Sequence, residues 1–330
     1  MTAHAPTGPP AIHVRGLVKR FGDIEAVAGI DLDVHPGETF GFLGPNGAGK
    51  STTINILCTL ASATEGRAEV AGFDVRTHRD EVRRRIGLVF QDPTLDVYLS
   101  AEQNLRFHAE LYGVPAATVD GRIDDVLRLV GLAERRTSPV RTFSGGMRRR
   151  LEIARGLLHA PEVLFLDEPT VGLDPQTRAS IWEYLTELAD DTGLTIFLTT
   201  HYLEEAENCD RIAIIDGGRI VALDTPDALK AAVGEDRIEI ETDDDELARQ
   251  RIGERFGIEP APRAERVTFS VAAGEQFVPR LFAELGVPIR SVSVSRPSLD
   301  DVFMAHTGRT IRDAEAGGAS ANPFAMAARR

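Results

Sequence analysis

The chain has 330 residues, a length that suggests two domains, and 42% of its residues are hydrophobic, enough to bury a sizeable core. Its formal net charge of −14 argues against a general nucleic-acid-binding protein. No run approaches the roughly 18 consecutive apolar residues of a membrane span, and the proline-rich start lacks the parts of a signal peptide. Composition therefore favours a cytoplasmic globular protein with reduced cysteines and a flexible N-terminal tail over 1–10.

Two alternating apolar runs, at 12–18 and 27–34, predict antiparallel strands that are joined by a turn around Phe21. A flat aromatic ring at such a turn can stack on a purine base. It can equally cap its own sheet, and the spacing of residues favours neither interpretation.

A strand predicted at 39–43 leads into a stretch that fits the pattern of a phosphate-binding loop, and a helix predicted at 52–60 follows. Glycines let backbone N–H groups approach phosphate oxygens, and the helix start adds the positive end of its dipole. Lys50 can reach the β- and γ-phosphates, and the Ser51 hydroxyl can bind Mg²⁺. The residues of this predicted nucleotide site are Gly44, Pro45, Asn46, Gly47, Ala48, Gly49, Lys50, Ser51 and Thr52. The loop alone leaves kinases, GTPases and transport ATPases open.

Further strands are predicted at 67–71 and 86–90, and Gln91 directly follows the second of them. An amide at the end of a strand can bind Mg²⁺ or orient a water molecule, although a lone Gln is more often an ordinary loop residue. The stretch from 92 to 140 carries helix patterns and no strand signal, so we expect a helical insert there.

A second anion-binding helix start is predicted at Ser144, which suits an N-cap and precedes Gly145 and Gly146. The two glycines expose backbone N–H groups at the start of a helix that runs through Leu158. The alternative is an ordinary capped helix. One nucleotide does not need two such helix starts unless they meet across a dimer.

The apolar strand predicted at 163–167 ends in Asp167, which suits a Mg²⁺ contact, and Glu168 suits a general base that polarises an attacking water. Another buried strand, at 195–199, is followed by His201 on the ligand side of the sheet. His201 can hydrogen-bond a γ-phosphate or serve as a structural cap. The alternation of strands and helices predicts a largely parallel core sheet covered by helices.

The order of these motifs resembles that of the nucleotide-binding subunits of ATP-binding cassette (ABC) transporters. The signature at residues 143–147 separates this family from other phosphate-loop ATPases. Met147 departs from the Gln that the family often has at the end of the signature, which leaves the glycine N–H donors in place. The matching elements are Phe21, the Walker A loop at 44–51, Gln91, the signature at 143–147, the Walker B Asp167 with Glu168, Asp174 and His201.

The resemblance implies an α/β fold, a P-loop NTPase cassette over 11–230. The cassette would have a mixed, largely parallel core sheet, an antiparallel β subdomain and a helical subdomain at about 92–160. It also implies that two copies close head to tail, each ATP lying between one Walker A loop and the partner's signature. Lys50, Ser51, Gln91 and Asp167 would then hold the phosphates and Mg²⁺, Glu168 would activate water, and His201 would sense the γ-phosphate.

Beyond about residue 235, three short predicted strands with acidic helices between them indicate a small α+β domain over 235–308, which we compare with the ferredoxin-like arrangement. The Ala- and Gly-rich tail over 309–330 is predicted to be disordered. The ending at 297–308 resembles that of daunorubicin/doxorubicin-resistance ABC ATPases, whose members pair with separate exporter permeases.

We therefore expect the ATP-hydrolysing subunit of a drug or lipid-like exporter, peripheral on the cytoplasmic face of a bacterial membrane and partnered by an integral membrane permease through its helical insert. One alternative is a soluble ABC-class ATPase acting on ribosomes or DNA. The acidic charge and the lack of tandem cassettes, a coiled coil or a basic arm disfavour it. A second alternative, a small-molecule kinase, would leave the signature and His201 without a role.

Overall fold

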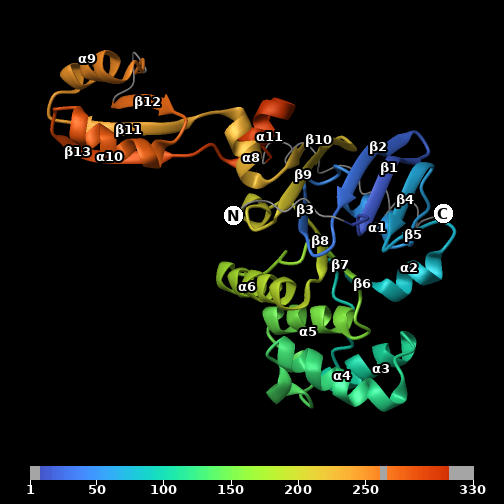
Figure 1. Ribbon diagram of the computed structural model, residues 1–330. Helices are drawn as coiled ribbons and strands as arrows, with labels where there is room; N and C mark the ends of the chain where they lie inside the picture. The colour runs from blue at the N-terminus through green and yellow to red at the C-terminus, as the bar shows by residue number, and fades with distance from the viewer. Residues whose placement is uncertain (1–7, 261–265, 312–330) are drawn as a thin grey trace. The chain divides into compact units, whose positions relative to one another are not determined.

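The computed structural model describes residues 8–260 and 266–311, and it divides into two compact units. The first unit runs to Thr225 and includes Ile311, and the second runs from Pro226 to Thr310. Figure 1 shows the elements of both units. The predicted tails over 1–10 and 309–330 fall largely outside the described residues. Within the described part of the chain, no helix combines the length and the apolar character that crossing a bilayer requires.

A six-stranded sheet forms the centre of the first unit, in the order β10-β9-β3-β8-β7-β6. Neighbouring strands from β9 to β6 are parallel, and β10 is antiparallel to β9. The strands are β3 (Thr39–Leu43), β6 (Ile86–Val89), β7 (Val163–Asp167), β8 (Thr195–Thr200), β9 (Arg211–Asp216) and β10 (Arg219–Asp224). The mixed, largely parallel core sheet is thus confirmed.

An antiparallel sheet in the order β2-β1-β4-β5 packs beside it. The strands predicted at 12–18 and 27–34 form the expected antiparallel pair. Both are longer than predicted, and they meet at a tight turn after Phe21. The members are β1 (Ile12–Phe21), β2 (Ile24–Val34), β4 (Glu65–Val70) and β5 (Phe73–Asp74).

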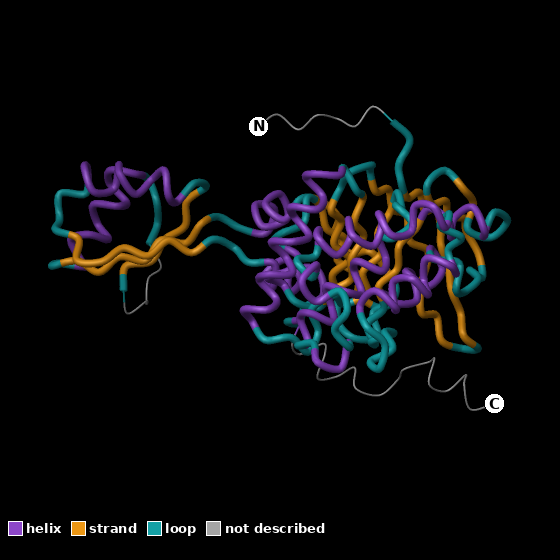
Figure 2. The backbone as a smooth tube through the Cα atoms, turned by 90° about the horizontal axis from the view of Figure 1, so that it is seen from below, coloured by secondary structure: helices purple, strands orange, loops and turns teal. Residues whose placement is uncertain are grey.

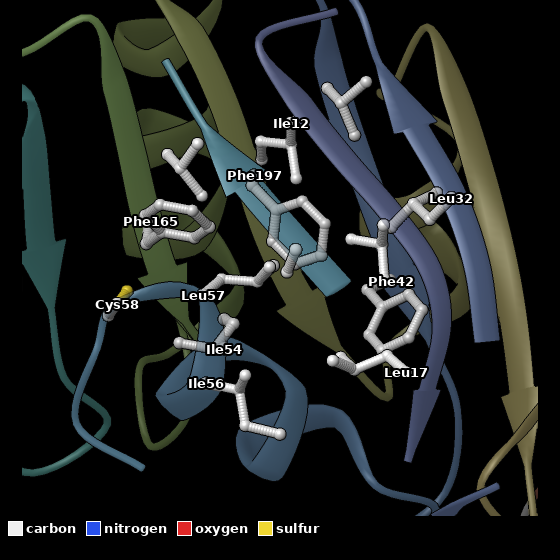
Figure 3. Close-up of a cluster of buried hydrophobic side chains, with 14 of the residues drawn as sticks. Ile12, Leu17, Leu32, Phe42, Ile54, Ile56, Leu57, Cys58, Phe165 and Phe197 are labelled. Carbon is white, nitrogen blue, oxygen red and sulfur yellow. The ribbon is translucent and has the colours of Figure 1, made fainter. Parts of the chain in front are cut away.

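Helix α1 (Lys50–Leu57) is held by its apolar face against the strands (Figure 3), where Ile54 and Leu57 join the cluster that contains Phe165 and Phe197. Burying such side chains contributes about 1.5–3 kcal/mol each, so the start of α1 is firmly positioned. The prediction of a helix at 52–60 was wrong at its C-terminal end, because α1 ends at Leu57. Thr59 takes a left-handed backbone conformation (φ 64°), and Leu60 is 53% exposed instead of packing in the core.

The remaining elements of the first unit are helical, and the insert predicted between Gln91 and Val140 holds helices and no long strand. Ser100 and Ser144 cap α3 and α5 by accepting bonds from Gln103 N and Met147 N, as their sequence positions predict. The helices are α2 (Arg79–Arg85), α3 (Ala101–Leu111), α4 (Ala116–Leu129), η1 (Ala133–Arg135), η2 (Val140–Thr142), α5 (Gly145–Leu157), α6 (Pro175–Thr192) and α7 (Leu203–Ala206).

The second unit contains a three-stranded antiparallel sheet in the order β12-β11-β13, with α9 and α10 on one face (Figure 2). Its own core includes Ile238, Ile252 and Leu281. The ferredoxin-like comparison was wrong, because that arrangement runs β-α-β-β-α-β, whereas here a helix separates each strand from the next. The elements are α8 (Pro226–Val233), β11 (Asp236–Thr242), α9 (Asp245–Phe256), β12 (Val267–Val271), α10 (Gly274–Glu284), β13 (Ile289–Ser295) and α11 (Leu299–Thr307).

Candidate nucleotide-binding site

At two positions of the loop between β3 and α1, no residue larger than glycine fits. A Cβ atom on Gly44 would lie 2.3 Å from the Ile215 carbonyl oxygen, and one on Gly49 would lie 2.4 Å from the Ala26 carbonyl oxygen. Gly49 also has φ 109°, which L side chains rarely adopt. The loop therefore curves tightly above the helix start, as phosphate binding requires. Within it Pro45 and Ala48 are buried, Asn46 and Gly47 are exposed, and Thr52 is buried on α1.

Lys50 lies beneath this loop with 4% of its side chain exposed. Its Nζ donates to the carbonyl oxygens of Gly44 (2.7 Å) and Pro45 (3.2 Å) and lies 3.4 Å from Glu168 Oε1. The ammonium group is therefore already located at the loop, where it can exchange these partners for phosphate oxygens.

Asp167 ends β7 directly opposite the start of α1. Ser51 Oγ donates to Asp167 Oδ1 at 3.2 Å, and Thr199 Oγ1 donates to the same oxygen at 2.5 Å. Burial raises the pKa of Asp167, and the bonds from Thr199 and Ser51 oppose that shift. A hydroxyl and a carboxylate side by side suit Mg²⁺, which keeps waters and substrate phosphates as its other ligands. Within the described ranges, no group of three or more His, Cys, Asp or Glu side chains could hold a metal ion by itself.

Glu168 has an unusual backbone conformation, with φ 46° in the left-handed region. Its N–H donates to the carbonyl oxygen (3.2 Å) and Oγ1 (3.1 Å) of Thr199, which holds that conformation in place. Strain of this kind, of order 1–3 kcal/mol, collects at functional sites. Burial by itself raises the pKa of Glu168, but contact with His201 and the charge of Lys50 outweigh burial and hold the pKa below its usual value. The carboxylate is therefore ionised, as a base must be.

The structure brings His201 to the site and leaves two other predicted residues less engaged. His201 Nδ1 lies 3.3 Å from Glu168 Oε1. Gln91 is exposed, two residues beyond the end of β6. Phe21 is half-buried at the end of β1, with Lys19 Nζ 4.7 Å from the centre of its ring.

The predicted second anion site lies at the start of α5, and Figure 1 draws α5 apart from α1, the helix that follows the phosphate loop. Ser144 is exposed, Gly145 is half-buried and Gly146 is buried. A Cβ atom on Gly146 would lie 2.4 Å from Thr177 Cγ2, so α6 fixes the glycine there. Asp174 caps α6 through the Thr177 N–H. The two predicted anion-binding helix starts therefore belong to different helices, which Figure 1 draws apart.

Sequence reasoning missed three residues that support the site. Thr199 binds both Asp167 and Glu168, and its only sequence signal is a hydroxyl within an apolar strand. Glu205 is 1% exposed and accepts a hydrogen bond from Thr170 Oγ1, and burial raises its pKa. Arg149 is 9% exposed, and its guanidinium donates to three backbone carbonyl oxygens, a set of partners that no sequence pattern reveals.

A hollow of about 810 Å³ lies elsewhere in the first unit and contains none of the predicted site residues. Its lining includes Pro36, Val126, Leu129 and Leu188, from the loop before β3 and from α4 and α6. The candidate nucleotide site at the strand ends is thus separate from this hollow.

Comparison with known proteins decides what this geometry belongs to. The family model described as "ABC transporter" matches residues 27–171, and the model "ATP-binding protein DrrA1-3-like, C-terminal domain" matches residues 225–307. The daunorubicin resistance ATP-binding protein DrrA3 of Streptomyces coeruleorubidus is 41% identical over 93% of this chain and 98% of its own length. The chain belongs to the ABC transporter ATP-binding proteins.

Other ABC ATP-binding proteins match over equally long stretches. The Nod factor export ATP-binding protein I of Ralstonia nicotianae is 39% identical over 95% of this chain and all of its own length. Among solved structures, cbiO1 from Clostridium perfringens, part of the transporter complex cbiONQ, has a TM-score of 0.64 at 28% identity, covering 76% of this chain and 97% of that one. The ABC cassette MJ0796, solved as a dimer with ADP and phosphate, has a TM-score of 0.59 at 28% identity and covers 65% and 98%. The chain is thus an ABC-type ATPase subunit.

Proposed function

We propose that this chain hydrolyses ATP to power the export of a drug-like or lipid-like compound through a separate integral membrane permease. The proposal rests on how much of the chain resembles its relatives, because the similarity covers the second unit as well as the cassette. Relatives that are named for daunorubicin resistance and Nod factor export match nearly from end to end. We accordingly assign 11–230 to the ATPase domain, with its helical subdomain at about 92–160, and 235–308 to an accessory domain.

In the proposed site, the loop from Gly44 to Thr52 encloses the phosphates of ATP, and Phe21 stacks on the base. Lys50 releases the loop carbonyl oxygens and binds the β- and γ-phosphates. Ser51, Gln91 and Asp167 hold Mg²⁺, which neutralises phosphate charge when bound. The adjacent oxygens of Ser51 and Asp167, 3.2 Å apart, support this assignment.

Glu168 acts as the general base that takes a proton from the attacking water. Its lowered pKa keeps the carboxylate ionised at neutral pH. His201, 3.3 Å from Glu168, orients that carboxylate and hydrogen-bonds the γ-phosphate, so that it senses whether the phosphate is present. The strained backbone of Glu168 places the carboxylate in advance of binding.

The nucleotide is shared by two copies of the chain that meet head to tail. The start of α5, with Ser144, Gly145 and Gly146, offers free N–H groups to the γ-phosphate that the partner copy holds. This assembly accounts for two phosphate-binding helix starts that lie apart within one copy.

The helical insert contacts the permease, and the chain is a peripheral protein at the cytoplasmic face of a bacterial cell membrane. Three large apolar side chains of the insert are more than half exposed: Tyr98 (83%), Phe107 (56%) and Leu111 (65%). Exposed apolar groups of this size suit a protein interface more than water.

Affinity purification of the tagged chain from its native membranes in detergent, followed by mass spectrometry, tests the proposal. We expect a polytopic membrane protein to co-purify, and Tyr98→Glu with Phe107→Glu to lower its recovery, while Phe282→Glu in the second unit leaves the recovery unchanged. Recovery of ribosomal or chromosomal proteins with no membrane protein would overturn the transport function and leave the ATPase chemistry standing.

A further inference from the structure

One face of α5 carries three charged side chains that are spaced one helical turn apart and buried. Arg149, Glu152 and Arg155 are 9%, 2% and 6% exposed. Charged groups are almost never buried without partners, so each of these must be satisfied inside the protein. None of the roles proposed above uses them.

Arg149 connects the ends of two neighbouring strands. Its Nη1 donates to the Phe90 carbonyl oxygen at 2.6 Å, next to Gln91. Its Nε and Nη2 donate to the carbonyl oxygens of Pro169 (2.6 Å) and Asp167 (3.3 Å), on either side of Glu168. Burial lowers the pKa of Arg149 to about 10, so the guanidinium stays a cation at neutral pH. Only the planar, five-donor guanidinium can reach three separate carbonyl groups in this way.

Glu152 holds the chain on the other side of Gln91. Its Oε1 accepts from the backbone N–H groups of Thr94 (2.7 Å) and Leu95 (3.2 Å), and its Oε2 accepts from Thr94 Oγ1 (2.9 Å). Arg155 completes the set, because its Nη2 lies 3.0 Å from Glu152 Oε2 and 3.3 Å from the Leu88 carbonyl oxygen. Residues on both sides of Gln91 are therefore hydrogen-bonded to one helix.

The helix also approaches β6 too closely to move without it. A Cβ atom on Gly87 would lie 2.4 Å from the Gly156 carbonyl oxygen, so the two backbones are in contact there. The hydrogen bonds and this contact make α5, the Gln91 segment and the end of β7 move together.

We propose that Arg149, Glu152 and Arg155, which we name the α5 clamp, position Gln91 and Glu168 for hydrolysis. The three residues lie on α5, the signature helix, so the position of this helix decides where Gln91 and Glu168 lie. The proposal rests on the proposed function, since it requires that the start of α5 bind the ATP of the partner copy. A shift of that helix start is then passed to the catalytic groups of the chain's own site. The three are positioning residues and do not touch ATP.

The test compares Arg149→Gln with Arg150→Gln in the full-length chain. Arg150 is the matched control, because it lies next on α5 and donates to the Val130 carbonyl oxygen in the insert instead of to the strand ends. We expect Arg149→Gln to lower kcat by about tenfold or more, since small displacements of catalytic groups have effects of that size. The Kd for MgATP and the Kd for ATP-driven dimerisation should stay within about twofold of those of the Arg150→Gln control, because neither the phosphate loop nor the signature is changed.

Glu152 provides a second, independent pair of variants. Glu152→Gln keeps an oxygen for the Thr94 and Leu95 N–H groups, whereas Glu152→Ala removes it. We expect the glutamine variant to retain most of the wild-type kcat and the alanine variant to lose about tenfold, with Tm lowered in both because Arg155 loses its counter-charge. This pair decides the question even if Arg149→Gln does not fold.

The outcomes separate this inference from the proposed function. If the wild-type chain has no ATPase activity, the proposed function fails. If the wild type is active and Arg149→Gln matches Arg150→Gln in kcat, or if Glu152→Ala matches Glu152→Gln, the α5 clamp is refuted while the proposed function stands.

Discussion

Three side chains meet at the centre of the site: Lys50, Glu168 and His201. In the structure Lys50 and His201 both lie within 3.4 Å of the same Glu168 oxygen, Oε1. These two groups keep the carboxylate ionised, and in the proposed site Lys50 turns toward phosphate when ATP binds. The proposed function therefore gives the two residues separable roles, phosphate binding for Lys50 and activation of water for Glu168.

Glu168→Gln removes the base and keeps the shape of the side chain. We expect kcat for ATP hydrolysis to fall by at least about 100-fold, the usual contribution of a general base, with the Kd for MgATP nearly unchanged. Phosphate release and nucleotide titration measure the two quantities. Glu162→Gln, at the other end of β7 and exposed to water, is the control. Turnover near the wild-type rate would show that Glu168 is not the base.

Lys50→Ala should instead weaken binding itself. Because a charge-assisted contact to the phosphates is lost, we expect the Kd for MgATP to rise by about tenfold or more. Lys230→Ala, in α8 of the second unit, should bind nucleotide like the wild type. Isothermal titration of both variants checks this, and equal affinities would refute the placement of Lys50 at the phosphates.

Elements that carry their own local signal could be predicted from the sequence, and contacts between elements could not. The strand, loop and helix around Lys50 follow from their pattern, and so does the N-cap at Ser144. The end of α1 was misjudged because Thr59 leaves the helix in a left-handed conformation that no apolar spacing reveals. Short helices such as α7, which brings Glu205 beneath the site, have too few residues to show a period.

Long-range partners explain the other misses. Arg149 binds carbonyl oxygens 59 and 18 to 20 residues away, and any residue type can supply a carbonyl oxygen. Thr199 acts on Asp167 only because β7 and β8 are paired in parallel register. In the second unit the strands could be placed, but their order depends on pairings that short alternating runs do not specify.

The helical insert offers a prediction about pH. Hydrogen bonds from Arg136 and Arg106 lower the pKa of Glu102 on α3 from 4.5 to about 2. Because the pKa is lower in the folded state, the stabilisation by Glu102 is fully present above about pH 4.5 and is lost as the pH falls toward 2. We therefore expect the free energies of unfolding of the wild type and Glu102→Gln to differ at pH 7. Urea unfolding between pH 7 and pH 3 should show that this difference shrinks below pH 4.5.

Glu110→Gln provides the comparison for that series, because Glu110 is exposed on the same helix. Its free energy of unfolding should follow that of the wild type across the range. A Glu102→Gln difference that stays constant from pH 7 to pH 3 would contradict the ion-pair account of this helix.

At the scale of the whole molecule, the central claim is that two copies complete each ATP site. Figure 1 draws α1, which follows the phosphate loop, apart from α5, the signature helix, and the start of each helix carries backbone N–H groups of the kind that suit phosphate. In the proposed assembly, ATP would join the copies, and its hydrolysis would remove the γ-phosphate that holds them. Membrane transport would use this cycle of closing and opening.

The most direct test is the molar mass of Glu168→Gln in solution with and without MgATP, alone and combined with Gly145→Asp. An acidic residue in the first turn of α5 favours the isolated helix but repels the partner's γ-phosphate. Gly145→Ala controls for the added Cβ, which would lie 3.2 Å from Leu173 Cδ2. The account predicts an ATP-dependent dimer for Glu168→Gln and for its Gly145→Ala form, and a monomer that still binds ATP for its Gly145→Asp form. A Glu168→Gln chain that stays monomeric with MgATP, or a dimer that Gly145→Asp leaves intact, would contradict it.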